Sequence, residues 1–218
     1  MMRRAPLTVW LLVALVLPAD AAPGRYLYIQ PLGQELPDAD VALVRQALVG
    51  FYRLEVKLLP RVDLPARAYY KPRKRYRAEK LLTFIESRLP ADGYRILGLT
   101  GVDISTTKGG YRDWGILGLA TIDGAACVIS SHRCRVHSGA VAARRSKERI
   151  RLAKVAVHEI GHTLGLEHCP VRGCLMEDAR GKVATCDREY DICRTCRARL
   201  RRARRAIPEQ PEIPWPRP

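Results

Sequence analysis

Aromatic residues are scarce in this chain, and it carries no apolar run of membrane-spanning length. Aromatics make up only 6% of the 218 residues, and none are interleaved with the arginines of its basic segments. A stacking surface for nucleic-acid bases requires such interleaved aromatics. The apolar run at residues 7–17 is about eleven residues long, whereas a membrane-spanning helix needs about 20. The overall hydrophobic content of 47% is that of a globular protein with a packed core.

Residues 1–21 have the three successive features of a secretory signal peptide. Arg3 and Arg4 precede the apolar run, and small residues then stand two positions apart at Ala19 and Ala21. We therefore expect a cleaved signal peptide and export to the periplasm or the extracellular space. The alternative is an uncleaved anchor or a buried N-terminal segment. No cysteine follows the run, so a lipid anchor is not suggested, and we expect no transmembrane segment in the mature chain.

Basic residues outnumber acidic ones, and the net charge is +16. Lysine and arginine concentrate in residues 67–80, 144–154 and 194–205. Such segments can attract nucleic acid, anionic polymers or acidic substrates. They can equally form solvated helix faces and a soluble tail. The second explanation is favoured because the arginines lack interleaved aromatics, so nucleic acid is not expected as a partner.

Strand and helix patterns alternate along the chain. Residues 38–52 have apolar side chains at Val41, Val44, Leu48 and Phe51, spaced as on one face of a helix. The same reasoning predicts helices at 77–89 and 146–166, and strands at 25–30, 54–59, 94–102, 116–120 and 126–130. An Asp123-Gly124 turn would join the last two strands into a hairpin. The alternation predicts an α+β fold, close to α/β, in which helices cover a mixed sheet.

We expect residues 22–206 to form one domain, with a smaller subdomain beginning at about residue 166. The segment at 60–76 is basic, contains prolines and is predicted to be a linker. Beyond Pro170 the chain is rich in cysteine and basic residues, and a short helix should follow. The Pro-rich tail, residues 207–218, is predicted to be disordered.

Residues 157–169 read VHEIGHTLGLEHC and contain three of the five histidines. His158 and His162 are four residues apart, so a helix places them on one face, one turn apart. Gly165 can end the helix with a positive φ, and His168 can then reach back to the same point. Three imidazole ligands that leave a fourth position open are typical of catalytic zinc. Glu159 projects beside these ligands and is a candidate general base.

The extended HExxHxxGxxH pattern, followed by a methionine turn, is the signature of the metzincin peptidases. Met176 is the candidate for that methionine, and its thioether would form an apolar floor below the zinc ligands. A simple core position is the alternative for Met176.

Four cysteines extend the resemblance to one family. Cys169 directly follows the third histidine, Cys174 precedes Met176 by two positions, and Cys193 and Cys196 form a Cys-x-x-Cys pair. This arrangement resembles the archaemetzincins over residues 158–196. The segments at 98–105 and 116–124 are similar to that family's sheet more loosely. The Met176–Cys193 spacing is one residue shorter than the expected pattern, and Cys186 is an additional cysteine.

The resemblance implies a twisted mixed sheet with backing helices, an active-site helix and a small Cys-rich helical subdomain. It also implies two zinc ions: a catalytic one at the histidines, and a structural one at Cys169, Cys174, Cys193 and Cys196. In an oxidising compartment the same four thiols could form two disulfides instead. Cys127 and Cys134 could form a local disulfide or remain as buried thiols, and Cys186 would then have no partner.

The function that these features predict is hydrolysis of peptide bonds by a zinc-activated water, with Glu159 as the general base. By analogy with the metzincins, an extended peptide or protein substrate would lie along a sheet edge, with backbone contacts from Gly118, Leu119 and Ala120. A monomer is expected. One alternative is a zinc amidase or deacylase that acts on a non-protein amide. The other is a non-catalytic zinc protein that binds through its basic surface, although such a protein has no need of Glu159.

Overall fold

The computed structural model describes residues 26–202 and 211–217. The predicted signal peptide, residues 1–21, and part of the predicted tail lie outside these ranges. The elements, in chain order, are β1 (Tyr26–Leu32), α1 (Asp38–Tyr52), β2 (Val56–Leu58), η1 (Ala66–Ala68), β3 (Tyr69–Tyr70), η2 (Lys71–Arg73), β4 (Arg75–Arg77), α2 (Ala78–Glu86), β5 (Gly93–Thr100), β6 (Ile104–Lys108), β7 (Tyr111–Ile116), β8 (Gly118–Ala120), β9 (Ala126–Ser130), η3 (His132–Cys134), α3 (Val141–Thr163), η4 (Val183–Asp187) and α4 (Arg194–Arg202).

The main sheet has five strands in the order β2-β1-β5-β9-β8. The first four strands are parallel to one another, and β8 runs antiparallel to β9 at the edge. The predicted hairpin at Asp123-Gly124 is therefore confirmed, and Asp123 has the positive φ of 52° that such a turn needs. Parallel strands require long crossover connections, and α1 and α2 lie in the connections from β1 to β2 and from β2 to β5.

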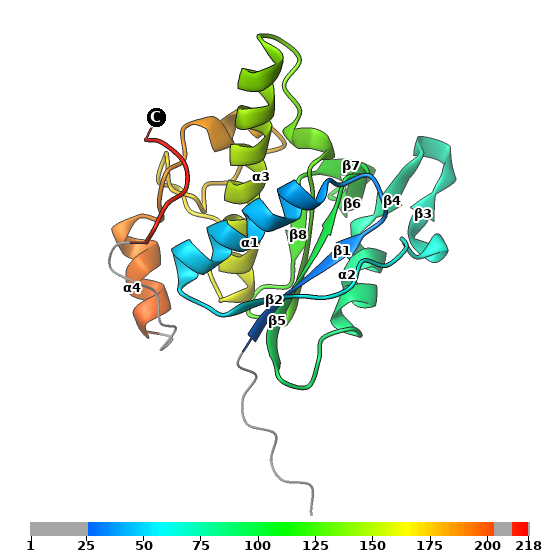
Figure 1. Ribbon diagram of the computed structural model, residues 1–218, viewed down its shortest axis with the longest axis horizontal. Helices are drawn as coiled ribbons and strands as arrows, with labels where there is room; N and C mark the ends of the chain where they lie inside the picture. The colour runs from blue at the N-terminus through cyan, green and yellow to red at the C-terminus, as the bar shows by residue number, and fades with distance from the viewer. Residues whose placement is uncertain (1–25, 203–210, 218) are drawn as a thin grey trace, which may run out of the picture.

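Helices cover both faces of this sheet (Figure 1). Side chains alternate along each strand, so Leu27 and Ile29 face one core while Tyr28 faces the other. Helices α1 and α3 pack on the first face, and α2 packs on the second. The predicted α+β architecture, with an active-site helix and a Cys-rich C-terminal region, is the one observed.

A second sheet of four strands, in the order β3-β4-β6-β7, was not predicted. Its strands are short and half-exposed, so they show no apolar alternation that would indicate strands. Charge pairs link its strands: Arg75 contacts Asp103 at 3.0 Å and Asp113 at 3.1 Å. The predicted basic linker thus contains β3 and β4, because its arginines find carboxylate partners on the neighbouring strands and loop.

The active-site helix α3 differs from its predicted range of 146–166. It begins at Val141 and ends at Thr163. The start was missed because residues 141–149 are largely exposed and carry no apolar stripe. The helix ends earlier than predicted because Gly165, with a φ of 87°, turns the chain out of the helix. Leu166 N–H then donates a hydrogen bond to Gly161 O.

The described part of the predicted disordered tail, residues 211–217, packs against the domain. Trp215 is only 4% exposed, and its indole N–H donates to Tyr190 O at 3.0 Å. Glu212 N–H donates to Gly50 O at the end of α1. The prediction of disorder is wrong here because one tryptophan buries enough apolar surface to hold a proline-rich segment. Within the described residues, no helix is both long enough and apolar enough to cross a membrane.

Candidate active site and metal centres

Helix α3 and the turn after it bring the three motif histidines together. His158 and His162 lie one turn apart, and their Nε2 atoms are 3.0 Å from each other. After Gly165 the chain turns back, so that His168 joins them from outside the helix. One ring nitrogen from each residue lies within 4.8 Å of the others. The sequence therefore predicted this cluster correctly.

Backbone carbonyls orient two of the three rings. His158 Nδ1 lies 2.6 Å from Leu175 O, and His162 Nδ1 lies 2.6 Å from Leu166 O. A carbonyl oxygen can only accept, so each Nδ1 is the protonated nitrogen and each Nε2 keeps its lone pair. Burial lowers the pKa of His158 to about 3 and also lowers that of His162. Both rings are thus held in the neutral form that binds a metal.

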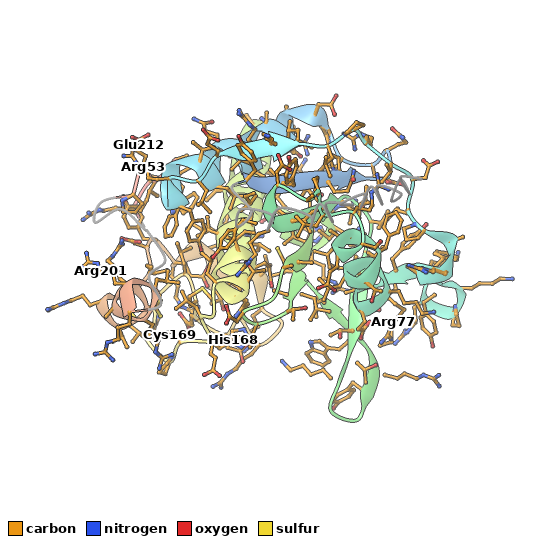
Figure 2. All side chains as sticks on the ribbon, turned by 90° about the horizontal axis from the view of Figure 1, so that it is seen from below. Arg53, Arg77, His168, Cys169, Arg201 and Glu212 are labelled. Carbon is orange, nitrogen blue, oxygen red and sulfur yellow. The ribbon has the colours of Figure 1, made fainter. Side chains whose placement is uncertain are left out.

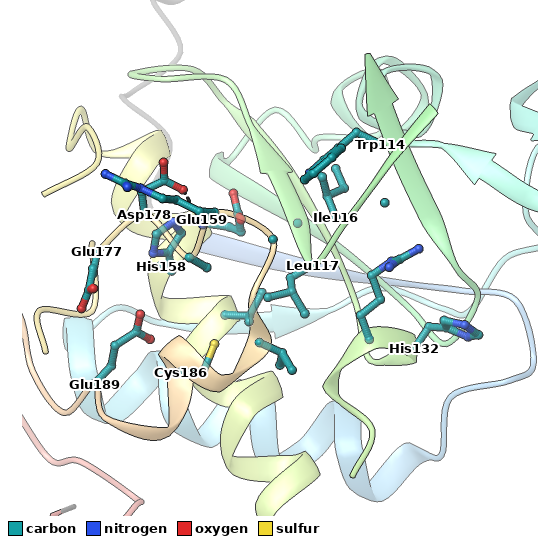
Figure 3. Close-up of a pocket in the computed structure, with 18 of the residues that line it drawn as sticks. Trp114, Ile116, Leu117, His132, His158, Glu159, Glu177, Asp178, Cys186 and Glu189 are labelled. Carbon is teal, nitrogen blue, oxygen red and sulfur yellow. Dashed lines mark hydrogen bonds between the residues drawn. The ribbon is translucent and has the colours of Figure 1, made fainter. Parts of the chain in front are cut away.

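Glu159 lies between the histidine cluster and the edge strand β8 (Figure 3). It is 6% exposed, and burial raises the pKa of its carboxyl group to about 8. A Cβ atom placed on Gly118 would lie 2.5 Å from Glu159 Oε1. Only glycine at position 118 therefore lets β8 approach the carboxyl group this closely.

Met176 packs beneath the histidine-bearing helix with no exposed surface. Its Sδ would lie 2.5 Å from a Cβ on Gly161, so this glycine lets the thioether contact the backbone of α3. Its carbonyl accepts from Cys169 N–H at 2.7 Å, which ties the turn to the third histidine. Tyr52 was missed by sequence reasoning: from α1, its buried hydroxyl donates to Val157 O at 2.7 Å.

A pocket of about 450 Å³ opens beside His158 and Glu159. Figure 3 shows Trp114 and Ile116 of β7 along one side, with Leu117 next to Ile116. Several basic side chains form another part of its wall, namely Lys108, His132, Arg133, Arg135 and His137. The basic residues of this wall come from β6, from η3 and from the segment after η3. No sequence pattern marked these segments as part of a site.

The predicted substrate contacts on β8 divide in the structure. Gly118 lines the pocket, whereas the side chains of Leu119 and Ala120 pack against the two cores on either side of the sheet. One edge of β8 pairs with β9, and β8 is the terminal strand of its sheet. Contacts from its backbone to a substrate stay a prediction.

The second cluster consists of the four predicted cysteines. Cys169 Sγ lies 3.7 Å from Cys193 Sγ, and Cys174 Sγ lies 3.9 Å from Cys196 Sγ. A disulfide requires about 2.05 Å, so these are not bonded pairs. Hydrogen bonding from Cys196 lowers the pKa of Cys174 to about 5, which favours a thiolate. Figure 2 shows Cys169 next to His168, with the two clusters joined at that point of the chain.

The other three cysteines are also free thiols. Cys127 lies in β9 and faces the core shared with α3, whereas Cys134 lies in η3 and contacts Ser130 O. The local disulfide considered for Cys127 and Cys134 is therefore not formed. Cys186 lies in η4 and lines the pocket.

Both donor sets fit zinc. Four sulfurs placed tetrahedrally about 2.3 Å from an ion are about 3.8 Å apart, close to the observed sulfur separations of 3.7 and 3.9 Å. Three imidazole nitrogens that converge within 4.8 Å, beside an open pocket, suit an ion with one free position. His158, His162 and His168 would hold the first ion, and the four cysteines the second.

Comparisons with known proteins agree with this arrangement. The model of peptidase family M54 matches residues 40–202. The archaemetzincin of Halobacterium salinarum is 33% identical over 175 residues, covering 77% of this chain and 95% of its own. Among solved structures, archaemetzincin from Methanopyrus kandleri has a TM-score of 0.70 at 27% identity, covering 86% of this chain and 99% of that one.

A second solved archaemetzincin, from Archaeoglobus fulgidus in complex with malonate, has a TM-score of 0.66 at 30% identity and covers 79% of this chain and 98% of that one. The residues matched by the family model include the helix α3 and the Cys-rich region that follows it. This chain accordingly belongs to peptidase family M54, the archaemetzincins, and is a zinc metallopeptidase of the metzincin type.

Proposed function

We propose that this enzyme hydrolyses peptide bonds with Glu159 as the general base. The observation that carries the proposal is the position of Glu159. It is one residue after a metal-binding histidine, against the edge strand, and at the wall of the pocket. A zinc ion held by the three histidines would polarise the scissile carbonyl and lower the pKa of a water molecule to about 7.

Two groups of the chain itself would carry out the proton transfer and position the substrate. A zinc ion beside Glu159 would lower the raised pKa of its carboxyl group and favour the carboxylate. The carboxylate takes a proton from the attacking water and delivers it to the leaving amine. The backbone of β8 positions an extended substrate by pairing with it as an added strand. Gly118 lets β8 lie beside the Glu159 carboxyl group, because any side chain at position 118 would displace that group.

The test is a peptide-library digest, read by mass spectrometry, with the mature protein and its Glu159→Ala variant at matched zinc content. Cleavages made by the parent and absent with the variant would support the proposal and reveal the cleavage preference. An equally active variant would remove Glu159 from the mechanism. If neither protein cleaves any peptide, a non-protein amide becomes the substrate to examine.

We further propose that the four cysteines bind a second, structural zinc ion, which is supported by their sulfur separations. Metal analysis should find two zinc ions per chain, with the four thiols protected from alkylation until the metal is removed. A single zinc ion, together with oxidised peptides spanning Cys169 to Cys196, would contradict this.

Export is likewise a proposal, supported by the signal-peptide pattern in residues 1–21. N-terminal sequencing of the protein recovered outside the cytoplasm should begin near residue 22. A retained Met1 would contradict it.

A further inference from the structure

The pocket extends past the histidine cluster along α3. Val155 precedes Glu159 by one helical turn on the same helix face, and both line the pocket. Val183 and Cys186, both from η4, line it as well. Small apolar and sulfur-bearing side chains therefore line the same pocket as His158 and Glu159.

Four carboxyl groups also line the pocket, and one of them, on Glu189, follows η4 in the chain. Glu189 lines the pocket and is only 3% exposed. Figure 3 shows it beside Cys186, with its carboxyl group turned toward the side where His158 lies. Among residues 26–202 and 211–217, this carboxyl group has no hydrogen bond or ion pair. Its side chain is therefore nearly buried, has no partner among these residues and borders the pocket, so the position of its carboxyl group calls for an explanation.

The charged groups around Glu189 are engaged elsewhere. Lys154 Nζ donates to Cys186 O at 2.8 Å and to Glu189 O at 2.5 Å, so its donors meet backbone carbonyls. Arg188 is paired with Glu177. Burial is the largest influence on the Glu189 carboxyl group and raises its pKa to about 8, although the Lys154 ammonium lowers it. A cation placed beside the carboxyl group would lower this pKa again and favour the carboxylate, which accepts N–H donors.

We propose that Glu189 forms the end of a specificity subsite that takes a lysine or arginine side chain of the substrate, at a residue next to the scissile bond. The methylene stem would lie against Val155, Val183 and Cys186, and the cationic head would meet the carboxyl group. The pocket volume of about 450 Å³ suffices for such a side chain. This inference rests on the proposed peptidase function, whose substrate class it specifies.

The first test compares two peptide series that differ only in having lysine or norleucine beside the cleaved bond. Norleucine keeps the stem without the ammonium group. The zinc-loaded parent should prefer lysine, and Glu189→Gln should reduce the lysine-to-norleucine ratio of kcat/KM by about 10- to 100-fold, as expected for a hydrogen bond to a charged group. An unchanged ratio in Glu189→Gln would overturn the proposal.

Glu86→Gln is the matched control, because it removes one carboxylate from the exposed surface of α2. It should leave the lysine-to-norleucine ratio at the parent value. A drop equal to that of Glu189→Gln would mean that overall charge, and not the subsite, sets the preference, and the proposal would then be wrong.

A binding measurement separates this inference from the peptidase proposal. Calorimetric titration of the zinc-loaded Glu159→Ala protein with the same peptides should give tighter binding of the lysine peptide, even if the parent cleaves no peptide at all. The double variant Glu159→Ala, Glu189→Gln should lose that difference by the same factor. Equal affinities for the two peptides in Glu159→Ala would overturn the subsite, whatever the result for cleavage.

Discussion

The two metal centres are adjacent in sequence yet differ in what surrounds them. The histidine centre lies at the wall of a pocket, and its third ligand, His168, is exposed. The cysteine centre has three buried members and one partly buried member, with sulfurs spaced as in a closed tetrahedral site. The difference supports two proposed roles for this one segment. The open donor set would serve the chemistry, and the closed set would hold the chain in place.

The strongest way to test the contrast is to remove one ligand of each centre. Cys174→Ser should destabilise the fold by several kcal/mol, because the binding of a structural zinc ion can contribute about 10 kcal/mol to folding. His162→Ala should cost less, about 1–3 kcal/mol, mainly because Leu166 O loses its partner. Thermal unfolding with zinc present checks both, and similar losses in the two variants would contradict the division of roles.

Glu159→Ala should leave both zinc ions in place and lower kcat by about 10² to 10⁴-fold, the usual contribution of a general base. Its unfolding temperature should stay close to that of the parent, because its carboxyl group is not a metal ligand in the proposed site. Zinc analysis and peptide hydrolysis on the same preparation measure the two effects. Loss of zinc from the variant would mean that Glu159 helps to hold the ion.

Gly118→Ala tests the role of the Glu159 carboxyl group by displacing it without removing it. The added Cβ would lie 2.5 Å from Glu159 Oε1, and the carboxyl group must shift. A misplacement of about 1 Å can cost about 10²-fold in rate, so activity should fall by a similar factor while stability changes little. Gly109→Ala is a matched control for glycine replacement with open space around its Cβ, although its φ of 55° adds some backbone strain.

Gly161→Ala should destabilise the fold less than Cys174→Ser does. Its Cβ would lie 2.5 Å from Met176 Sδ, at the end of a flexible side chain. Overpacking of this kind typically costs about 1–3 kcal/mol. Denaturant unfolding measures the loss. Met176→Leu should restore the stability of Gly161→Ala if the loss comes from this contact. If the double variant is no more stable than Gly161→Ala, the loss comes from another contact.

Much of the site could be read from the chain because its residues are close in sequence. A four-residue spacing on a helix and a glycine-ended turn bring His158, His162 and His168 together by local geometry alone. The position of Glu189 could not be read in this way. Its place at the pocket depends on η4 folding back over α3, where Arg151 donates to both carboxylate oxygens of Asp187 at 2.8 Å.

The sequence by itself determined the histidine cluster, the β8–β9 hairpin and the alternating order of strands and helices, because spacing and periodicity act over a few residues. The cysteine quartet was implied by the resemblance to the archaemetzincins. Only the tertiary structure decided the second sheet, the packing of Trp215 and the wall of the pocket. Those features depend on contacts between distant segments, such as Arg75 with Asp103 and Asp113, in which neither partner carries a local signal. These charges are half-buried and of opposite sign, and the paired residues lie far apart in the chain.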